Sequence, residues 1–310
     1  MVFSERAHIN AALQALVVCF VWSTSFIVTK YLYGEGIGPV TLTGLRYALA
    51  SLVLLPLWWW RRHRTSPDSP QRPRLRLWTL IGLGLAGYAI NPLGYTIGLT
   101  VLPAGWVGVV LGVNNTLQVL LFSALLLRER PTPVQLAAIV VATLGTVFFH
   151  LPGGAPADAV LLPTLAVLIS GVGYALWVVG NRSLLRGVGP LELTFPSMLV
   201  GSLPVLCVGV AVEGLPRLPV SAWAVILGLA AINTSAAFLV WTHTQRALAT
   251  HESAAINNTM TIQVALLAFL LLGEQLTAWQ WALIGVVAAA TLTVQTTGKP
   301  RPASEALTNG

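Results

Sequence analysis

Neutral polar side chains interrupt several long apolar stretches of this chain. They are Asn91 before Pro92 and the runs Asn114-Asn115-Thr116, Asn233-Thr234-Ser235 and Asn257-Asn258-Thr259. An amide offers hydrogen-bond donors and an acceptor together, so a set of amides can bind both the amino and the carboxylate group of a zwitterion. Within hydrocarbon a polar side chain is costly, and one that persists there faces a cavity or bonds another helix. These runs therefore mark candidate positions for a solute path.

Several aromatic residues lie deeper in the apolar stretches than an interfacial belt would place them, and flat apolar walls are typical of small-molecule pockets. The alternative is that the amides join helices and the tryptophans fill the core. Because the amides recur in both halves of the chain, we favour a cavity for the set. The predicted substrate-binding residues are Trp22, Tyr88, Asn91, Tyr95, Asn114, Asn115, Trp177, Asn233, Thr234, Trp241, Asn257 and Asn258.

Charged groups are scarce within the apolar stretches. Every Asp and Glu falls in a loop or near a helix end, which disfavours an exporter of organic cations. Arg46 is the one charge inside a span, and it either bonds carbonyls, snorkels outward or recognises a substrate carboxylate. His243, His251 and Glu252 are candidates for proton coupling, with a vestibule-facing or helix-capping role as the alternative.

Composition points to a membrane protein: 55% of residues are hydrophobic and only 9% are charged. The mean hydropathy is +0.77, and no water-soluble domain covers its surface with so few charges. The net charge of +7 does not indicate nucleic acid, because no aromatic interleaving surrounds the basic residues. Cys19 and Cys207 lie in apolar runs, so we expect no disulfide and no metal site.

A spanning helix needs about 20 mostly apolar residues, and cutting the chain at its charges and Gly/Pro clusters predicts an all-α integral membrane protein with ten transmembrane helices. The first stretch is too long for a secretory signal, so we expect it to remain as a membrane helix. The predicted spans are 10–32, 38–60, 77–99, 103–127, 132–151, 160–183, 190–212, 220–246, 251–272 and 278–297.

The positive charges test this division, because Lys and Arg accumulate on cytoplasmic loops. With the amino terminus inside, only Lys30 and Arg217 fall on the outer side. We therefore expect a multi-pass protein of the inner (plasma) membrane with cytoplasmic N- and C-termini. The residues assigned to the cytoplasmic side are Arg6, Arg61, Arg62, Arg64, Arg72, Arg74, Arg76, Arg128, Arg130, Arg182, Arg186, Arg246, Lys299 and Arg301.

An internal duplication is the most specific signal in the chain. Gln118, Glu129, Thr132 and Gln135 recur at one spacing as Gln263, Glu274, Thr277 and Gln280. Residues 1–151 and 152–298 are predicted to form two five-helix repeats, followed by a polar tail over 299–310. Five spans is an odd number, so the copies are inverted, which is typical of carriers that bind a solute in a central cavity and work by alternating access. A duplication kept only for packing is the alternative.

The motifs Trp22-Ser23-x-x-Phe26, Leu45-Arg46 and Leu272-Gly273-Glu274 resemble those of the EamA group of the drug/metabolite transporter superfamily. Within that group the paired Asn-Asn-Thr runs look most like the YddG-type exporters of aromatic amino acids. The first copy departs from the pattern because it ends Leu127-Arg128-Glu129. The resemblance implies a secondary transporter that exports small neutral or zwitterionic metabolites, aromatic or bulky apolar amino acids among them.

Other functions remain as alternatives. They are export of drugs or other metabolites within the same superfamily, and a non-saturable, channel-like pore. An enzyme is disfavoured: His251-Glu252 begins like a zinc-protease helix, but Ala255 stands where the second histidine belongs, and there is no Gly-x-Ser-x-Gly motif. We expect no cofactor and no nucleic acid, only a small-molecule substrate and the lipid bilayer, and a working monomer is compatible with the sequence.

Overall fold

The computed structural model describes residues 5–63, 75–102, 104–129, 131–150, 161–185, 187–272 and 277–297. Every regular element within these ranges is a helix. The six-arginine loop beyond His63, the linker 151–160, Glu274 and the predicted tail 299–310 lie wholly or largely outside them. The helices are α1 (Glu5–Gly34), α2 (Pro39–His63), α3 (Leu77–Leu85), η1 (Ala86–Ile90), α4 (Asn91–Val101), α5 (Ala104–Phe122), η2 (Ser123–Leu127), α6 (Pro133–His150), α7 (Leu161–Leu184), α8 (Pro190–Glu213), α9 (Val220–Gly228), η4 (Leu229–Ala236), α10 (Ala237–Thr244), α11 (Thr250–Asn258), α12 (Met260–Leu272) and α13 (Ala278–Thr297).

Seven helical stretches in the described ranges are long and apolar enough to cross a membrane, which confirms the all-helical class. Two shorter apolar helices, Pro133–Phe148 and Ala278–Val294, accompany them. α11 and α12 are separated at Thr259. The division into ten spans stays a prediction. The seven stretches are Arg6–Gly34, Pro39–His63, Leu77–Val101, Val110–Leu127, Leu162–Leu184, Pro190–Glu213 and Val220–Thr244.

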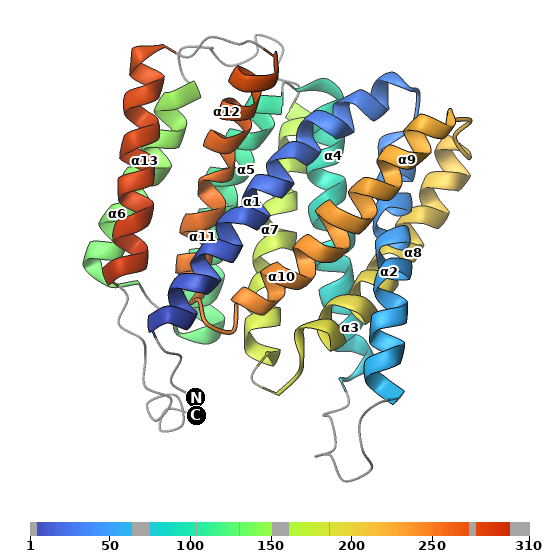
Figure 1. Cartoon of the computed structure of the whole chain (residues 1–310), viewed down its shortest axis with the longest axis horizontal. Helices are drawn as coiled ribbons and strands as arrows, with labels where there is room; N and C mark the ends of the chain where they lie inside the picture. Colours follow the sequence, from blue (N-terminus) through green and yellow to red (C-terminus); the bar gives the residue numbers. More distant parts are fainter. Residues whose placement is uncertain are drawn as a thin grey trace.

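The helices pack in a reciprocal pattern. α1 packs on α10, α11 and α12, and α7 packs in the corresponding way on α4 and α5. Likewise α2 contacts η4 while α8 contacts α3 and η1. Equivalent helices also meet each other: α2 lies beside α8 at one edge of the bundle and α6 beside α13 at the other (Figure 1). A duplicated unit related by a twofold axis would give this pattern.

The bundle has two ends, which we name by their residues. The arginine end carries Arg61, Arg62, Arg182 and Arg246, and the Pro39 end is the one where α2 begins. α1 starts and α13 finishes at the same end of the bundle (Figure 1). Glu213 at the end of α8 accepts hydrogen bonds from the backbone N–H groups of Val40 and Thr41, at 3.1 and 2.7 Å, and so caps α2 at the Pro39 end.

Two wide helical turns occupy matching places in the halves. η1 separates α3 from α4, and η4 separates α9 from α10. In the first case Pro92 supplies a cause, because proline lacks the amide hydrogen that a continuous α-helix would use and its ring crowds the preceding turn. In η4 the hydroxyls of Thr234 and Ser235 donate to the carbonyls of Leu229 and Ala230, at 3.0 and 2.8 Å. These bonds satisfy carbonyls that the widened turn exposes.

The repeated Thr-x-x-Gln pattern has a structural role. Before α6, the Thr132 N–H donates to Gln135 Oε1 at 3.0 Å and the Gln135 N–H donates to Thr132 Oγ1 at 3.3 Å. Thr277 and Gln280 make the same two bonds before α13, at 2.9 and 3.3 Å. Each pair is a capping box that satisfies orphan amides at a helix start.

Close backbone approach requires glycine at several places among the described residues, and two examples show the geometry. A Cβ on Gly201 of α8 would lie 2.1 Å from the Gly84 carbonyl oxygen of α3. A Cβ on Gly94 of α4 would lie 2.3 Å from the Ala166 carbonyl oxygen of α7. Larger side chains would force these helices apart, as expected for membrane helices that associate through small residues.

Glu129 joins three helices at the arginine end. Its carboxylate accepts from Arg182 Nε of α7 at 3.3 Å, and from the N–H and hydroxyl of Thr250 of α11 at 3.2 and 2.9 Å. Arg182 also donates to the carbonyls of Gln245 and Arg246. Burial favours the neutral acid, but the Arg182 charge and the Thr250 donors outweigh it and hold the pKa of the Glu129 carboxyl below its usual value.

We predict that Glu129→Gln lowers the thermal unfolding midpoint in detergent at pH 7 by about 2–4 °C, for a loss of about 1 kcal/mol. A depressed pKa in the folded protein gives stability that is present above the ordinary value of 4.5 and is lost as the pH falls through the folded value. The difference between variant and wild type should therefore shrink below about pH 4. Glu35→Gln, in the turn after α1, is the control, and a pH-independent difference would contradict the ionic link.

Candidate functional site

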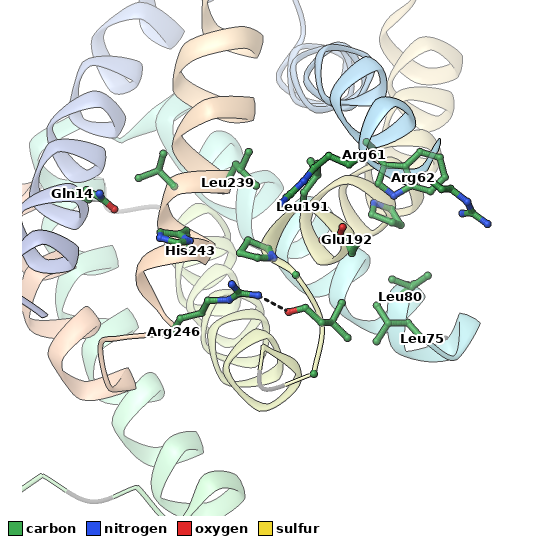
Figure 2. Close-up of a pocket in the computed structure, with 17 residues that line it drawn as sticks. Gln14, Arg61, Arg62, Leu75, Leu80, Leu191, Glu192, Leu239, His243 and Arg246 are labelled. Carbon is green, nitrogen blue, oxygen red and sulfur yellow. Dashed lines mark hydrogen bonds between the residues drawn. The ribbon is translucent and has the colours of Figure 1, made fainter. Parts of the chain in front are cut away.

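A cavity of about 1160 Å³ opens at the arginine end, among α2, α3, α8 and α10. Trp58 and Arg61 line it from α2, Leu191 from α8, and Leu239 and His243 from α10. Figure 2 shows Gln14 and His243 on one side of it, with Arg61, Arg62 and Glu192 on the other. Its volume is slightly above the range of about 300–1,000 Å³ that is usual for small-molecule pockets.

The mouth of the cavity is cationic. Three arginines, Arg61, Arg62 and Arg246, line it together with one carboxylate, Glu192. The Arg62 guanidinium lies 5.0 Å from the Trp58 ring centroid, and Arg246 Nη2 donates to the Val188 carbonyl at 3.2 Å (Figure 2). A basic entrance of this kind raises the local concentration of solutes that carry a carboxylate.

A cluster of buried aromatic residues, the aromatic core, joins several helices near the cavity. We define it as Trp22, Tyr47, Tyr88, Trp177, Phe238 and Trp241. Phe238 is its hub: its ring centroid lies 5.0 Å from Trp22, 5.2 Å from Tyr88, 5.3 Å from Trp177 and 5.7 Å from Tyr47. Leu239 and Val240, the next residues of α10, line the cavity, so the core and the cavity are adjacent along this helix.

Trp22, Tyr88, Trp177 and Trp241, which we predicted as pocket walls, all belong to this core and are buried. None of them lines the cavity in this conformation. The indole N–H group of Trp241 has no hydrogen-bond partner within the described residues, whereas Trp177 lies beside the Tyr88 hydroxyl. Because buried donors are almost always paired in proteins, the unpaired Trp241 donor is a candidate to bind a polar atom of a solute.

Asn91 and Asn233 make equivalent ties between the two halves. Asn91 Nδ2 donates to the Ser170 carbonyl of α7 at 3.2 Å, and the Ser170 hydroxyl donates back to the Asn91 carbonyl at 2.7 Å. Asn233 Nδ2 donates to the Val21 carbonyl of α1 at 2.5 Å, and Trp22 Nε1 donates back to the Asn233 carbonyl at 3.0 Å. Both amides thus join helices, as the alternative interpretation expected.

The Asn-Asn runs lie where α5 packs against α7 and α11. Asn114 Nδ2 donates to the Leu168 carbonyl of α7 at 2.8 Å. Asn115, Asn257 and Asn258 are buried. Asn115 Oδ1 and both amide atoms of Asn258 have no partner in the part of the chain that the structure describes.

Tyr95 and Thr234 come together around Arg46. Arg46 Nε donates to Thr234 Oγ1 at 2.7 Å, and Arg46 Nη1 donates to the Tyr95 hydroxyl at 3.4 Å. Nothing in the sequence pattern paired these side chains, because they belong to α2, η4 and α4 and meet only through the fold.

The candidates for proton coupling lie in different surroundings. His243 is exposed and lines the cavity, whereas His251 and Glu252 are buried. Glu252 accepts a hydrogen bond from the Ala249 N–H at 2.7 Å, which is the helix-capping alternative, and lies 3.3 Å from His8 Nε2. Sequence reasoning missed His8 because its partner is 244 positions away. The described residues contain no group of three or more His, Cys, Asp or Glu side chains that could hold a metal ion.

Sequence comparisons reveal known relatives. The chain is 26% identical over 272 residues to a probable terminal-alkyne amino-acid exporter of Streptantibioticus cattleyicolor, covering 86% of this chain and 87% of the relative. It is 28% identical over 190 residues to an uncharacterized transporter of Archaeoglobus fulgidus, covering 61% of this chain and 63%, less than two thirds, of that relative. The uncharacterized transporter YyaM of Bacillus subtilis is 21% identical over 84% of this chain and 86% of its own length.

A solved crystal structure has the same fold, with a TM-score of 0.74 over 92% of this chain and 97% of that chain, at 19% identity. The model of the EamA-like transporter family matches twice, over residues 9–151 and 161–296. The two matches repeat one domain along nearly the whole described chain, and the helices that they contain are apolar enough to cross a membrane several times. The chain is therefore a multi-pass membrane protein that belongs to the EamA-like transporter family.

Proposed function

We propose that this transporter exports small neutral or zwitterionic metabolites, amino acids with aromatic or bulky apolar side chains first among them, by alternating access. The observation that carries the proposal is the one-sided cavity. The residues that line it lie toward the arginine end, and the aromatic core is adjacent to it in α10. A carrier caught open to one face has this form.

In this proposal the chain crosses the inner membrane ten times, as two inverted five-helix repeats with both termini in the cytoplasm. The reciprocal packing of α1 on α10 and of α7 on α4 supports the inverted relation. Arg61, Arg62, Arg182 and Arg246 at one end, with Arg217 in the turn beyond Glu213 at the other, support a cytoplasmic arginine end. The cavity then faces the compartment from which an exporter collects its substrate.

The substrate class follows from the chemistry around the cavity and from one relative. Aromatic rings and the unpaired indole N–H group of Trp241 suit a flat or bulky side chain with polar atoms at one end. The cationic mouth suits a carboxylate. The Streptantibioticus relative is a probable exporter of an amino acid with a terminal alkyne, a zwitterion with an apolar side chain.

We predict that the purified protein in proteoliposomes transports L-phenylalanine at a rate that saturates with concentration, because a carrier must complete a conformational cycle for each substrate. Other bulky amino acids should compete, whereas tetraethylammonium and glucose 6-phosphate should not. Empty liposomes give the background. A rate that stays linear at high concentration would favour a pore, and transport of the organic cation alone would overturn the substrate class.

We also predict one-sided access to the cavity. In a background with Cys19→Ala and Cys207→Ser, the substitution Val240→Cys places a thiol on the cavity wall. A membrane-impermeant maleimide should label it about tenfold faster, or more, from the arginine end than from the Pro39 end, since the aromatic core blocks the second route. L-phenylalanine should slow the labelling.

Arg217→Cys in the same background is the matched control, because Arg217 is exposed near the Pro39 end. It should react only from that side and without protection by the amino acid. Equal labelling of the Val240→Cys protein from both sides would mean that the core does not close the path.

A further inference from the structure

Arg46 is a buried charge within a membrane-crossing helix. It lies in α2, seven residues after Pro39, and its exposed fraction is 4%. Its guanidinium carbon is 5.6 Å from the centroid of the Tyr47 ring. A cation in such a place carries a large desolvation cost unless it is paired, and intramembrane ionisable residues are functional in most cases.

The hydrogen-bond partners of Arg46 are neutral. Nε donates to the Thr234 hydroxyl at 2.7 Å, and Nη1 makes a long contact of 3.4 Å with the Tyr95 hydroxyl. No carboxylate of the described residues lies within ion-pair distance of this guanidinium; the ion pairs found there join Arg182 to Glu129 and His8 to Glu252. A guanidinium has five N–H donors in a planar fork that matches a carboxylate, so most of its binding capacity is unused.

The position of Arg46 is the second observation. Tyr47, the next residue, belongs to the aromatic core and contacts Phe238 and Tyr88. Tyr95 lies seven residues beyond Tyr88 toward the Pro39 end and stacks on Phe26 at 5.8 Å. Arg46 therefore lies one layer beyond the core, on the side that the cavity does not reach in this conformation.

The duplication shows that packing alone does not require an arginine here. Pro39 and Pro190 begin the equivalent helices α2 and α8, and seven residues later α8 has Ser197 in place of Arg46. The Ser197 hydroxyl bonds the Leu193 carbonyl of its own helix. The same helix pair thus accepts a small neutral residue in one copy and a charge in the other.

We propose that Arg46 binds the carboxylate of the transported solute once the solute has passed the aromatic core. Tyr95 and Phe26 then lie beside the apolar or aromatic group of the solute. The inference rests on the proposed function and narrows the substrate class to carboxylates that carry an apolar or aromatic group. Simple amines of the same size lack the group that Arg46 binds. Thr234 and Tyr95 hold the guanidinium in place until the carboxylate arrives.

The test compares L-phenylalanine with L-phenylalaninamide, which keeps the ring and the amine but lacks the negative charge. In wild-type proteoliposomes we expect the KM for the amide to be about tenfold to a hundredfold higher, the range of a lost charged hydrogen bond. In Arg46→Gln this preference should fall to about twofold or less, since both ligands then meet a neutral group. Because the ratio compares two ligands on one preparation, it does not depend on expression level.

Two further variants separate charge recognition from folding. Arg46→Lys keeps the charge without the planar fork, so its preference should stay above that of Arg46→Gln. Arg217→Gln makes the same charge change at an exposed site and should leave the preference at its wild-type value. Monodispersity in detergent checks that each variant is folded.

The outcomes are distinct. If wild type transports phenylalanine and the amide with equal KM, carboxylate recognition is excluded while amino acid transport stands. Arg46 is structural, and the inference is wrong, in either of two cases. In the first, Arg46→Gln and Arg46→Lys lose transport of both ligands in parallel. In the second, the two variants show the same ratio of KM values for the amide and the amino acid. If wild type transports no amino acid, the proposed function fails and takes this inference with it.

Discussion

The reciprocal hydrogen bonds of Asn91 and Asn233 join the two halves of the protein, and the rest of the structure depends on this connection. A polar group in hydrocarbon must find its partner within the protein. Asn91 finds it in Ser170 of α7, and Asn233 finds it in Val21 and Thr24 of α1. Each such bond contributes only about 0.6–2 kcal/mol, which keeps the halves in register without making their contact permanent. Both ties lie at a wide helical turn, where the backbone is already irregular.

The aromatic core joins helices of both halves through ring contacts, which differ from the hydrogen bonds of the two asparagines. Its rings contact at centroid distances of 5.0 to 5.9 Å, a geometry in which each pair adds about 0.5–1.5 kcal/mol beyond area burial. Phe238 contacts four of the other rings, from α1, α2, η1 and α7, so a shift of α10 changes all four contacts at once. Aromatic contacts have little directional demand compared with a hydrogen bond, so rings can slide and pack again. In the proposed function, this core is the barrier that opens to the solute.

The repetitive features were predictable from sequence and the contacts between distant segments were not. Length and apolar composition predicted the all-helical, membrane-crossing class, whereas the count of ten spans stays a prediction. The common spacing of Thr132 and Gln135 with Thr277 and Gln280 indicated the repeat, which agrees with the two family matches and the paired capping boxes. Phe238 was missed because an apolar ring in an apolar helix carries no local signal. His8 with Glu252, and Glu129 with Arg182, depend on helix ends that meet only through the fold. The predicted pocket walls Trp177 and Trp241 are packed in this conformation, since sequence indicates depth in a span but not the state of a carrier.

The two halves agree in backbone and differ in chemistry, and that difference is what a carrier for an asymmetric solute needs. The paired turns η1 and η4 and the paired capping boxes give the two halves the same backbone features. Two features break that symmetry: the arginines Arg61 and Arg62 at the mouth of the cavity, and Arg46, whose equivalent position in the second repeat is Ser197. A solute with a carboxylate at one end and a ring at the other has distinct ends, so a symmetric lining would bind it in two opposed orientations. In the proposed function, Arg46, which has Ser197 as its uncharged counterpart in the second copy, favours one orientation of such a solute.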